Sequence, residues 1–150
     1  MSISLDDLKV LRAQTGAGVL ACRSALEESD GDMEQAIAIL KVKGLEKAAE
    51  KSDREIRDGL VVSYIHSGGK IGSLVKLGCE TDFVARMDEF KELATNIAQQ
   101  AAAMAPSSVD ELLEQSYIRD PSKTVGDLVT DLVAKVKENI VLVDYYRLEV

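Results

Sequence analysis

Apolar and polar positions repeat with two different periods along the chain, and the period changes near residue 60. In residues 1–45, apolar residues recur every three or four positions, as they do in amphipathic helices. Leu5, Val19 and Met33 begin three such stripes, and Gly44 stands at the end of the third. The pattern predicts three short helices joined by tight glycine turns.

From residue 59 the pattern changes to strands. Leu60–His66 and Ile71–Leu77 are rich in β-branched residues, and Ser67–Lys70 between them is a glycine-containing hairpin loop. A third apolar run, Ile140–Val150, reaches the last residue. In the second strand the apolar side chains fall on one face, which predicts a three-stranded antiparallel sheet with one covered side.

Helical stripes lie between the second and third strands. One runs from Phe90 to Met104, a short helix follows at Val109–Gln115, and another stripe covers Val125–Val136. Helices beside an antiparallel sheet give an α+β fold. Residues 46–58, rich in Lys, Glu and Ala, predict a charged helical linker. We therefore expect a three-helix module at 1–45, that linker, and an α+β core and dimerisation domain at 59–150.

Charge and composition narrow the classes of partner. The 150 residues include 18 Lys and Arg against 26 Asp and Glu, for a net charge of −8, which disfavours direct nucleic-acid binding. No apolar run approaches the roughly 20 residues that span a bilayer, so no membrane partner is expected. The first seven residues show no secretory signal, and two isolated cysteines, Cys22 and Cys79, form no disulfide framework or metal site. A cytoplasmic protein is expected.

Few residues in the sequence could perform bond chemistry. There is a single histidine, His66, and no motif surrounds Ser63, Ser67 or Cys79. A nucleophile needs a base or a lowered pKa, so we do not expect an enzyme, and Cys79 on an apolar face is typical of a buried side chain. Gly16–Gly18 lacks the strand and the Gly-Lys-Ser/Thr of a nucleotide loop, so we expect no cofactor and no direct nucleotide.

The junction between the second strand and the following helix contains an unusual aromatic residue. Phe83 is one of only two phenylalanines, and it lies beside Asp82 just after a helix-opening Thr81. Two interpretations are open. Phe83 packs back onto its own helix as a hydrophobic staple, or it protrudes towards a partner as an Asp-Phe wedge.

Cys79–Arg86 (CETDFVAR) resembles the signature of elongation factor Ts, the nucleotide-exchange factor for elongation factor Tu. Arg12–Gly18, with Cys22, Ala25 and Leu26, is similar to the N-terminal ubiquitin-associated-like module of that family, and Tyr64–Gly72 is similar to its hairpin. The resemblance covers nearly the whole chain and implies a short form with a single core subdomain.

The resemblance also implies a function and a set of contact residues. In the family the module docks on the nucleotide-binding domain of elongation factor Tu, and the Asp-Phe pair intrudes near its Mg²⁺ site to promote GDP release. The positions of this chain that match these motifs are Arg12, Val19 and Leu20 in the module and Thr81, Asp82, Phe83, Val84, Ala85 and Arg86 at the junction. An alternative is an adaptor without exchange activity that binds partner proteins through its three-helix module.

The chain departs from the family near its last strand. Lys137–Tyr145 resembles the family's Gly-Glu-Asn-Ile segment, but Lys137 replaces the glycine, and Val143 and Asp144 replace a basic pair. A single three-stranded sheet also leaves apolar surface and two edges uncovered. We therefore expect a homodimer in which a second copy covers the sheet.

Overall fold

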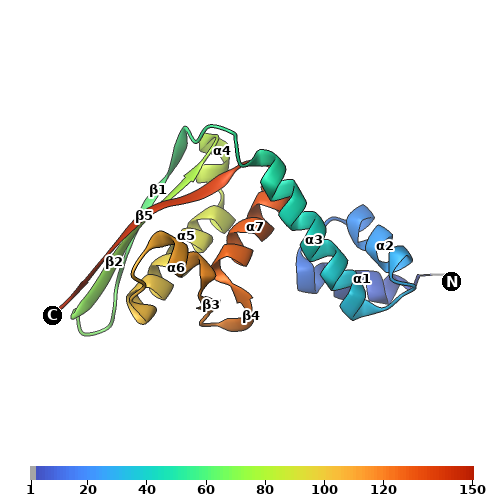
Figure 1. Ribbon diagram of the computed structural model, residues 1–150, viewed down its shortest axis with the longest axis horizontal. Helices are drawn as coiled ribbons and strands as arrows, with labels where there is room; N and C mark the ends of the chain where they lie inside the picture. Colours follow the sequence, from blue (N-terminus) through green and yellow to red (C-terminus); the bar gives the residue numbers. More distant parts are fainter. Residues whose placement is uncertain (1–2) are drawn as a thin grey trace.

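The computed structural model describes residues 3–150, so the first two residues of the predicted module lie outside it. The molecule is elongated, with three N-terminal helices at one end and a sheet at the other, and the C-terminus lies at the far end of the sheet (Figure 1). The chain combines helices with an antiparallel sheet, which confirms the predicted α+β class. Within residues 3–150, no helix has the length and apolar character that a bilayer crossing requires.

The N-terminal helices are α1 (Leu5–Thr15), α2 (Val19–Glu28) and α3 (Met33–Lys51). Ser4 and Asp32 cap α1 and α3 by accepting hydrogen bonds from backbone N–H groups of the first turn. Five side chains with no solvent exposure form the centre of this group: Leu11, Cys22, Ala25, Leu26 and Ala36. Ile37, which the stripe of α3 would place inside, is exposed.

The prediction that the third helix ends at Gly44 is wrong, because α3 continues to Lys51. Glycine inside a helix costs about 1 kcal/mol, but the residues after it are mostly strong helix formers. Packing against α7 (Val125–Val136) adds support, including an ion pair of 3.4 Å between Lys41 and Asp127. About half of the predicted linker is therefore the end of α3.

The sheet consists of β1 (Asp58–Ile65), β2 (Ile71–Cys79) and β5 (Ile140–Glu149), in the order β1-β2-β5 with both pairs antiparallel. This confirms the predicted three-stranded sheet. Gly68 and Gly69 in the hairpin loop have φ angles of +93° and +72°, which only glycine adopts easily.

The remaining elements are α4 (Asp82–Ala85), α5 (Asp88–Met104), α6 (Val109–Glu114), and a small hairpin of β3 (Ser116–Tyr117) and β4 (Asp120–Thr124). The helices lie on one side of the sheet (Figure 1). The stripe predicted for α5 is confirmed at Phe90, Ala94, Ile97 and Ala101, which are buried. Met104, the last residue predicted in it, is 49% exposed, because the helix ends there with Ala105 in the left-handed region.

Candidate functional site

The corner between β2 and α5 is a single helical turn with two different faces. Val84 and Ala85 are each 4% exposed and belong to the main core, whereas Phe83 is 82% exposed. Burying a phenylalanine side chain is worth roughly 1.5–3 kcal/mol, which this chain forgoes at Phe83. The staple interpretation is therefore excluded, and Phe83 protrudes.

Asp82 lies beside Phe83 in the first turn of α4, where a carboxylate interacts favourably with the free N–H groups of the helix. Its other partner is Arg86, one turn later, at 3.1 Å. Both side chains are at least half exposed, so this ion pair adds little stability. Asp82, Phe83 and Arg86 thus form a solvent-facing group of one anion, one aromatic ring and one cation.

Thr81 precedes the turn but does not cap α4 with its side chain. Its hydroxyl instead donates to Glu138 Oε2 at 2.6 Å. Glu138 Oε1 accepts from the backbone N–H groups of Thr81 and Glu80, at 3.0 and 3.2 Å. One carboxylate from the segment before β5 therefore holds the loop that carries the corner.

Cys79 closes β2 directly below this loop. Its side chain is buried, and its thiol donates to the carbonyl of Thr81 at 3.2 Å. Burial, with smaller contributions from the negative charges of Glu138 and Asp58, raises the pKa of Cys79 to about 11. The thiol is protonated at neutral pH, as a core residue would be and a nucleophile would not.

The three module residues predicted as contacts lie at the corner between α1 and α2. Arg12 is in the last turn of α1, and Val19 and Leu20 open α2, with Leu20 81% exposed. Helix α3 begins after the opposite end of α2 and runs to the neighbourhood of α4 (Figure 1). The predicted contacts thus come from two separate parts of the chain, the corner between α1 and α2 and the turn between β2 and α5.

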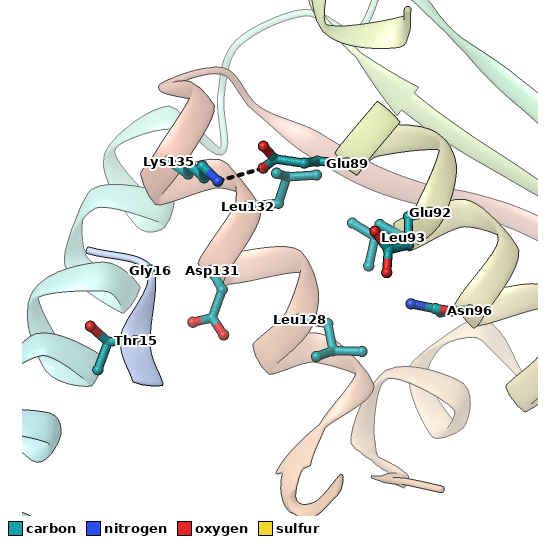
Figure 2. Close-up of a pocket in the computed structure, with 10 residues that line it drawn as sticks. All are labelled: Thr15, Gly16, Glu89, Glu92, Leu93, Asn96, Leu128, Asp131, Leu132 and Lys135. Carbon is teal, nitrogen blue, oxygen red and sulfur yellow. Dashed lines mark ion pairs between the residues drawn. The ribbon is translucent and has the colours of Figure 1, made fainter. Parts of the chain in front are cut away.

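At the seam between the module and the core is a pocket of about 220 Å³, open to solvent (Figure 2). Thr15 and Gly16 approach it from the end of α1, and the rest of its lining comes from α5 and α7. An ion pair of 2.8 Å between Glu89 and Lys135 joins those two helices (Figure 2). The pocket includes none of the predicted contact residues.

The outer face of the sheet, away from the helices, is a third exposed surface. In the register of the sheet, Val61, Leu74 and Tyr146 lie on this face, with exposures of 66%, 46% and 68%. Further exposed apolar residues continue it along the strands: Ile65, Val141, Val143 and Leu148. Ser63, Lys76 and Asp144 lie on the same face, so the surface is mixed, with exposed apolar residues on all three strands. Lone exposed apolar side chains are ordinary, but a group of them on one face is typical of an interaction surface.

Comparison with known proteins identifies the family. An elongation factor Ts of Thermotoga neapolitana is 42% identical, and the alignment covers this whole chain and 98% of the relative. The chain belongs to the elongation factor Ts family. The family's profile, "Elongation factor TS", matches residues 80–150, which begin at the loop before the Phe83 corner.

Other relatives with the same name support this assignment. One from Thermoanaerobacter pseudethanolicus is 41% identical over 98% of this chain and 94% of its own length. One from Clostridium botulinum is 49% identical over 92% of this chain but only 45% of its own length. The Thermotoga alignment runs over 193 positions against 150 residues here, so that relative has residues without a counterpart in this chain.

The sequence did not assign a role to Glu138 or to its neighbour Asn139. Asn139 is 6% exposed, and its side-chain amide donates to the carbonyls of Ser52 and Arg54 at 3.3 and 2.9 Å. The available signal was the resemblance of this segment to Gly-Glu-Asn-Ile, but their partners lie more than 50 positions earlier and only the fold reveals them.

Proposed function

We propose that this protein is a guanine nucleotide exchange factor that binds elongation factor Tu with GDP and promotes release of the GDP. Membership of the elongation factor Ts family supports the proposal. The observation that carries it is the 82% exposure of Phe83 on a turn whose next two residues are anchored in the core. An adaptor acting only through its N-terminal helices would have no use for such a residue.

Exchange of this kind needs no bond chemistry. A factor that binds the GTPase more tightly when its site is empty weakens bound GDP by the same factor. Tight GDP binding depends on the phosphate cradle and Mg²⁺, so a small displacement of the elements that hold them weakens GDP. Every 1.4 kcal/mol lost by the bound nucleotide corresponds to about a tenfold change in affinity.

The residues take different parts in this proposal. Phe83 enters the partner's nucleotide-binding domain as an aromatic anchor. Asp82 beside it accepts hydrogen bonds from N–H groups of the partner and repels nearby acidic or phosphate groups. Arg86 and the exposed edge of Thr81 complete that surface. Val84 and Ala85 are buried in the free chain, so we assign them to the support of the corner instead of direct contact.

The N-terminal module supplies a second contact. We propose that Arg12, Val19 and Leu20 dock on the nucleotide-binding domain of the same partner, while the charged residues around them remain solvated. In this proposal the module binds the partner, and the Phe83 corner acts on the partner's nucleotide site.

We also propose that the protein is a homodimer through the outer face of its sheet. Two such faces packed against each other would cover the surface that contains Val61, Leu74 and Tyr146. A dimer of this kind leaves the Phe83 corner and the module free, because neither belongs to that face.

The direct test is the rate at which fluorescently labelled GDP leaves elongation factor Tu. The wild-type chain should accelerate release strongly, and Phe83→Ala should lose at least about tenfold of that acceleration, as expected for loss of an interface anchor. Because Phe83 is exposed, the variant should unfold at the same temperature as the wild type. No acceleration by folded wild-type protein would refute the proposed function.

A further inference from the structure

We propose that Glu138 and Asn139 are positioning residues that fix the Phe83 corner relative to the N-terminal helices. The inference rests on the proposed exchange function and names the residues that hold the corner in position for it. The two residues are consecutive, lie between α7 and β5, and contact segments far from them in the sequence.

Glu138 holds the corner itself. Its carboxylate accepts three hydrogen bonds, two from the backbone N–H groups of Glu80 and Thr81 and one from the Thr81 hydroxyl. Hydrogen bonds to an ionised acceptor are stronger than neutral ones. A four-residue helix such as α4 has too few internal hydrogen bonds to hold its own position. Its position therefore depends on Glu138 from one side and on its two buried residues from the other.

Asn139 holds the turn that follows α3. Its side-chain amide donates to the carbonyls of Ser52 and Arg54, and its backbone N–H donates to Glu80 Oε1 at 2.7 Å. Arg54 also forms an ion pair of 3.5 Å with Glu80. The end of α3 and the loop before α4 are thus bound to the same pair of residues, in agreement with the closeness of the two elements in Figure 1.

This arrangement links the two proposed contact surfaces. Helix α3 has the module at its first end and the turn held by Asn139 at its last end (Figure 1). Along its length it packs on α7, where Lys41 pairs with Asp127 at 3.4 Å. A partner that touches both surfaces then meets them already oriented, which reduces the ordering cost of binding.

The two residues should affect exchange in different ways. Glu138→Ala should lower the maximal rate of labelled-GDP release from elongation factor Tu by about tenfold, because a misplaced group loses most of its effect. Glu138→Gln, which keeps an acceptor for the N–H groups and the same shape, should recover most of that rate. Asn139→Asp, which places acceptors against two carbonyls, should instead raise the half-saturating concentration.

A matched control is Lys123→Ala. This variant also loses an ion pair between two elements, that of Lys123 in β4 with Asp131 in α7 at 3.0 Å, and β4 lies at the opposite end of the core from α4 (Figure 1). It should leave both the maximal rate and the half-saturating concentration unchanged. If it lowers the maximal rate as much as Glu138→Ala does, loss of stability and not loss of position is the cause, and the proposal is overturned.

A second readout needs no partner. Phe83 and Phe90 are the only phenylalanines, one 82% and one 0% exposed, so fluorophenylalanine labelling gives two ¹⁹F signals with Phe90 as an internal control. In Glu138→Ala the Phe83 signal should change and the amide hydrogen of Thr81 should exchange faster, while the Phe90 signal stays the same. If the Phe90 signal also changes in Glu138→Ala, the Phe83 signal and the exchange rate of the Thr81 amide are measured in Glu138→Gln instead, and they decide the positioning role.

The two readouts separate failure of the proposal from failure of the proposed function. An unchanged maximal rate in Glu138→Ala, with active wild type, overturns the positioning role. If wild type does not accelerate GDP release at all, the proposed function fails, and the Phe83 signal and the Thr81 amide then decide the positioning role alone. Unchanged values for both overturn it, and changed values support it.

Discussion

At the scale of single residues, neighbours in one turn of α4 have opposite environments. Phe83 is almost fully exposed, and Val84 and Ala85 after it are almost fully buried. Because Val84 and Ala85 are anchored in the core, the turn is fixed with Phe83 exposed to solvent. Hydrophobicity alone would have placed Phe83 in the core, so its exposure distinguishes this corner from an ordinary strand-to-helix connection.

Lys137 is a residue whose backbone conformation does not suit its side chain. It ends α7 with a φ angle of +61°, in the left-handed region that costs a non-glycine residue about 1–2 kcal/mol. Lys137→Gly should therefore raise the free energy of unfolding by about 0.5–1 kcal/mol, after the larger entropy loss of glycine is subtracted. Urea unfolding measures this change.

Lys47→Gly is the matched control, because Lys47 lies inside α3 with ordinary helical geometry. It should lower the free energy of unfolding by about 1 kcal/mol. A loss of stability in Lys137→Gly would contradict the account of this helix end.

Cys79 gives the stability a dependence on alkaline pH. Its pKa is raised from 9.0 to about 11 in the folded chain, first by burial and then by the charges of Glu138 and Asp58. Above pH 9 the unfolded chain loses this proton while the folded chain keeps it, so the stabilisation present at lower pH is lost as pH rises towards 11. Urea midpoints should fall more steeply over this range in wild type than in Cys79→Ala. Parallel curves would show that Cys79 is not the group responsible.

At the scale of elements, α3 depends on the helix continuing through Gly44. A Cβ atom at Gly44 would have no atom within 4 Å, and the position is an ordinary helical one. Gly44→Ala should therefore stabilise the protein by about 0.5–1 kcal/mol, since alanine loses less backbone entropy. Thermal unfolding measures the change.

Gly16→Ala is the control for this substitution. Gly16 has equal space around it but a φ angle of +67°, so alanine there should destabilise the protein. If Gly44→Ala is destabilising too, α3 bends or breaks at Gly44 in solution.

The elements with strong periodicity could be predicted from the sequence, and the irregular ones could not. The three strands of the sheet and the helices α5, α6 and α7 follow directly from apolar spacing. The predicted end of α3 at Gly44 is wrong, although glycine is a typical helix-end signal. Packing on α7 and the strong helix formers after Gly44 extend the helix to Lys51. The β3–β4 hairpin was missed, because its strands are short and contain Pro121, which disfavours a strand.

The residues of the candidate site also divide into those that the sequence indicates and those that it does not. The exposed Asp82-Phe83 pair was indicated by the rarity of phenylalanine and by resemblance to the family. Glu138 and Asn139 carry no local signal of their role, since their partners at 52–54 and 80–81 become neighbours only when β5 pairs with β2. Long-range hydrogen bonds of this kind depend on topology, which one sequence does not specify residue by residue.

At the scale of the whole molecule, the proposed homodimer predicts that the oligomeric state depends on the outer face of the sheet. Leu74→Lys places a charge in the middle of this face and should convert a dimer at micromolar concentration into a monomer. The variant should keep its secondary structure, because Leu74 is 46% exposed within one chain. Sedimentation velocity measures the change.

Thr95→Lys adds the same charge on the exposed side of α5, away from the sheet face, and should remain dimeric. Wild-type protein that sediments as a monomer at the same concentration would contradict the homodimer.

The proposed function depends on coupling between this chain and the nucleotide bound to elongation factor Tu. The most direct measurement is a pair of affinities, one for elongation factor Tu without nucleotide and one for elongation factor Tu with GDP. An exchange factor should bind the empty form at least about tenfold more tightly, GDP affinity should fall by the same factor when the chain is bound, and the ratio of the two affinities should be close to one for Phe83→Ala. Equal affinity of the wild type for the two forms would contradict the proposed function and would leave a protein that binds its partner without acting on the nucleotide.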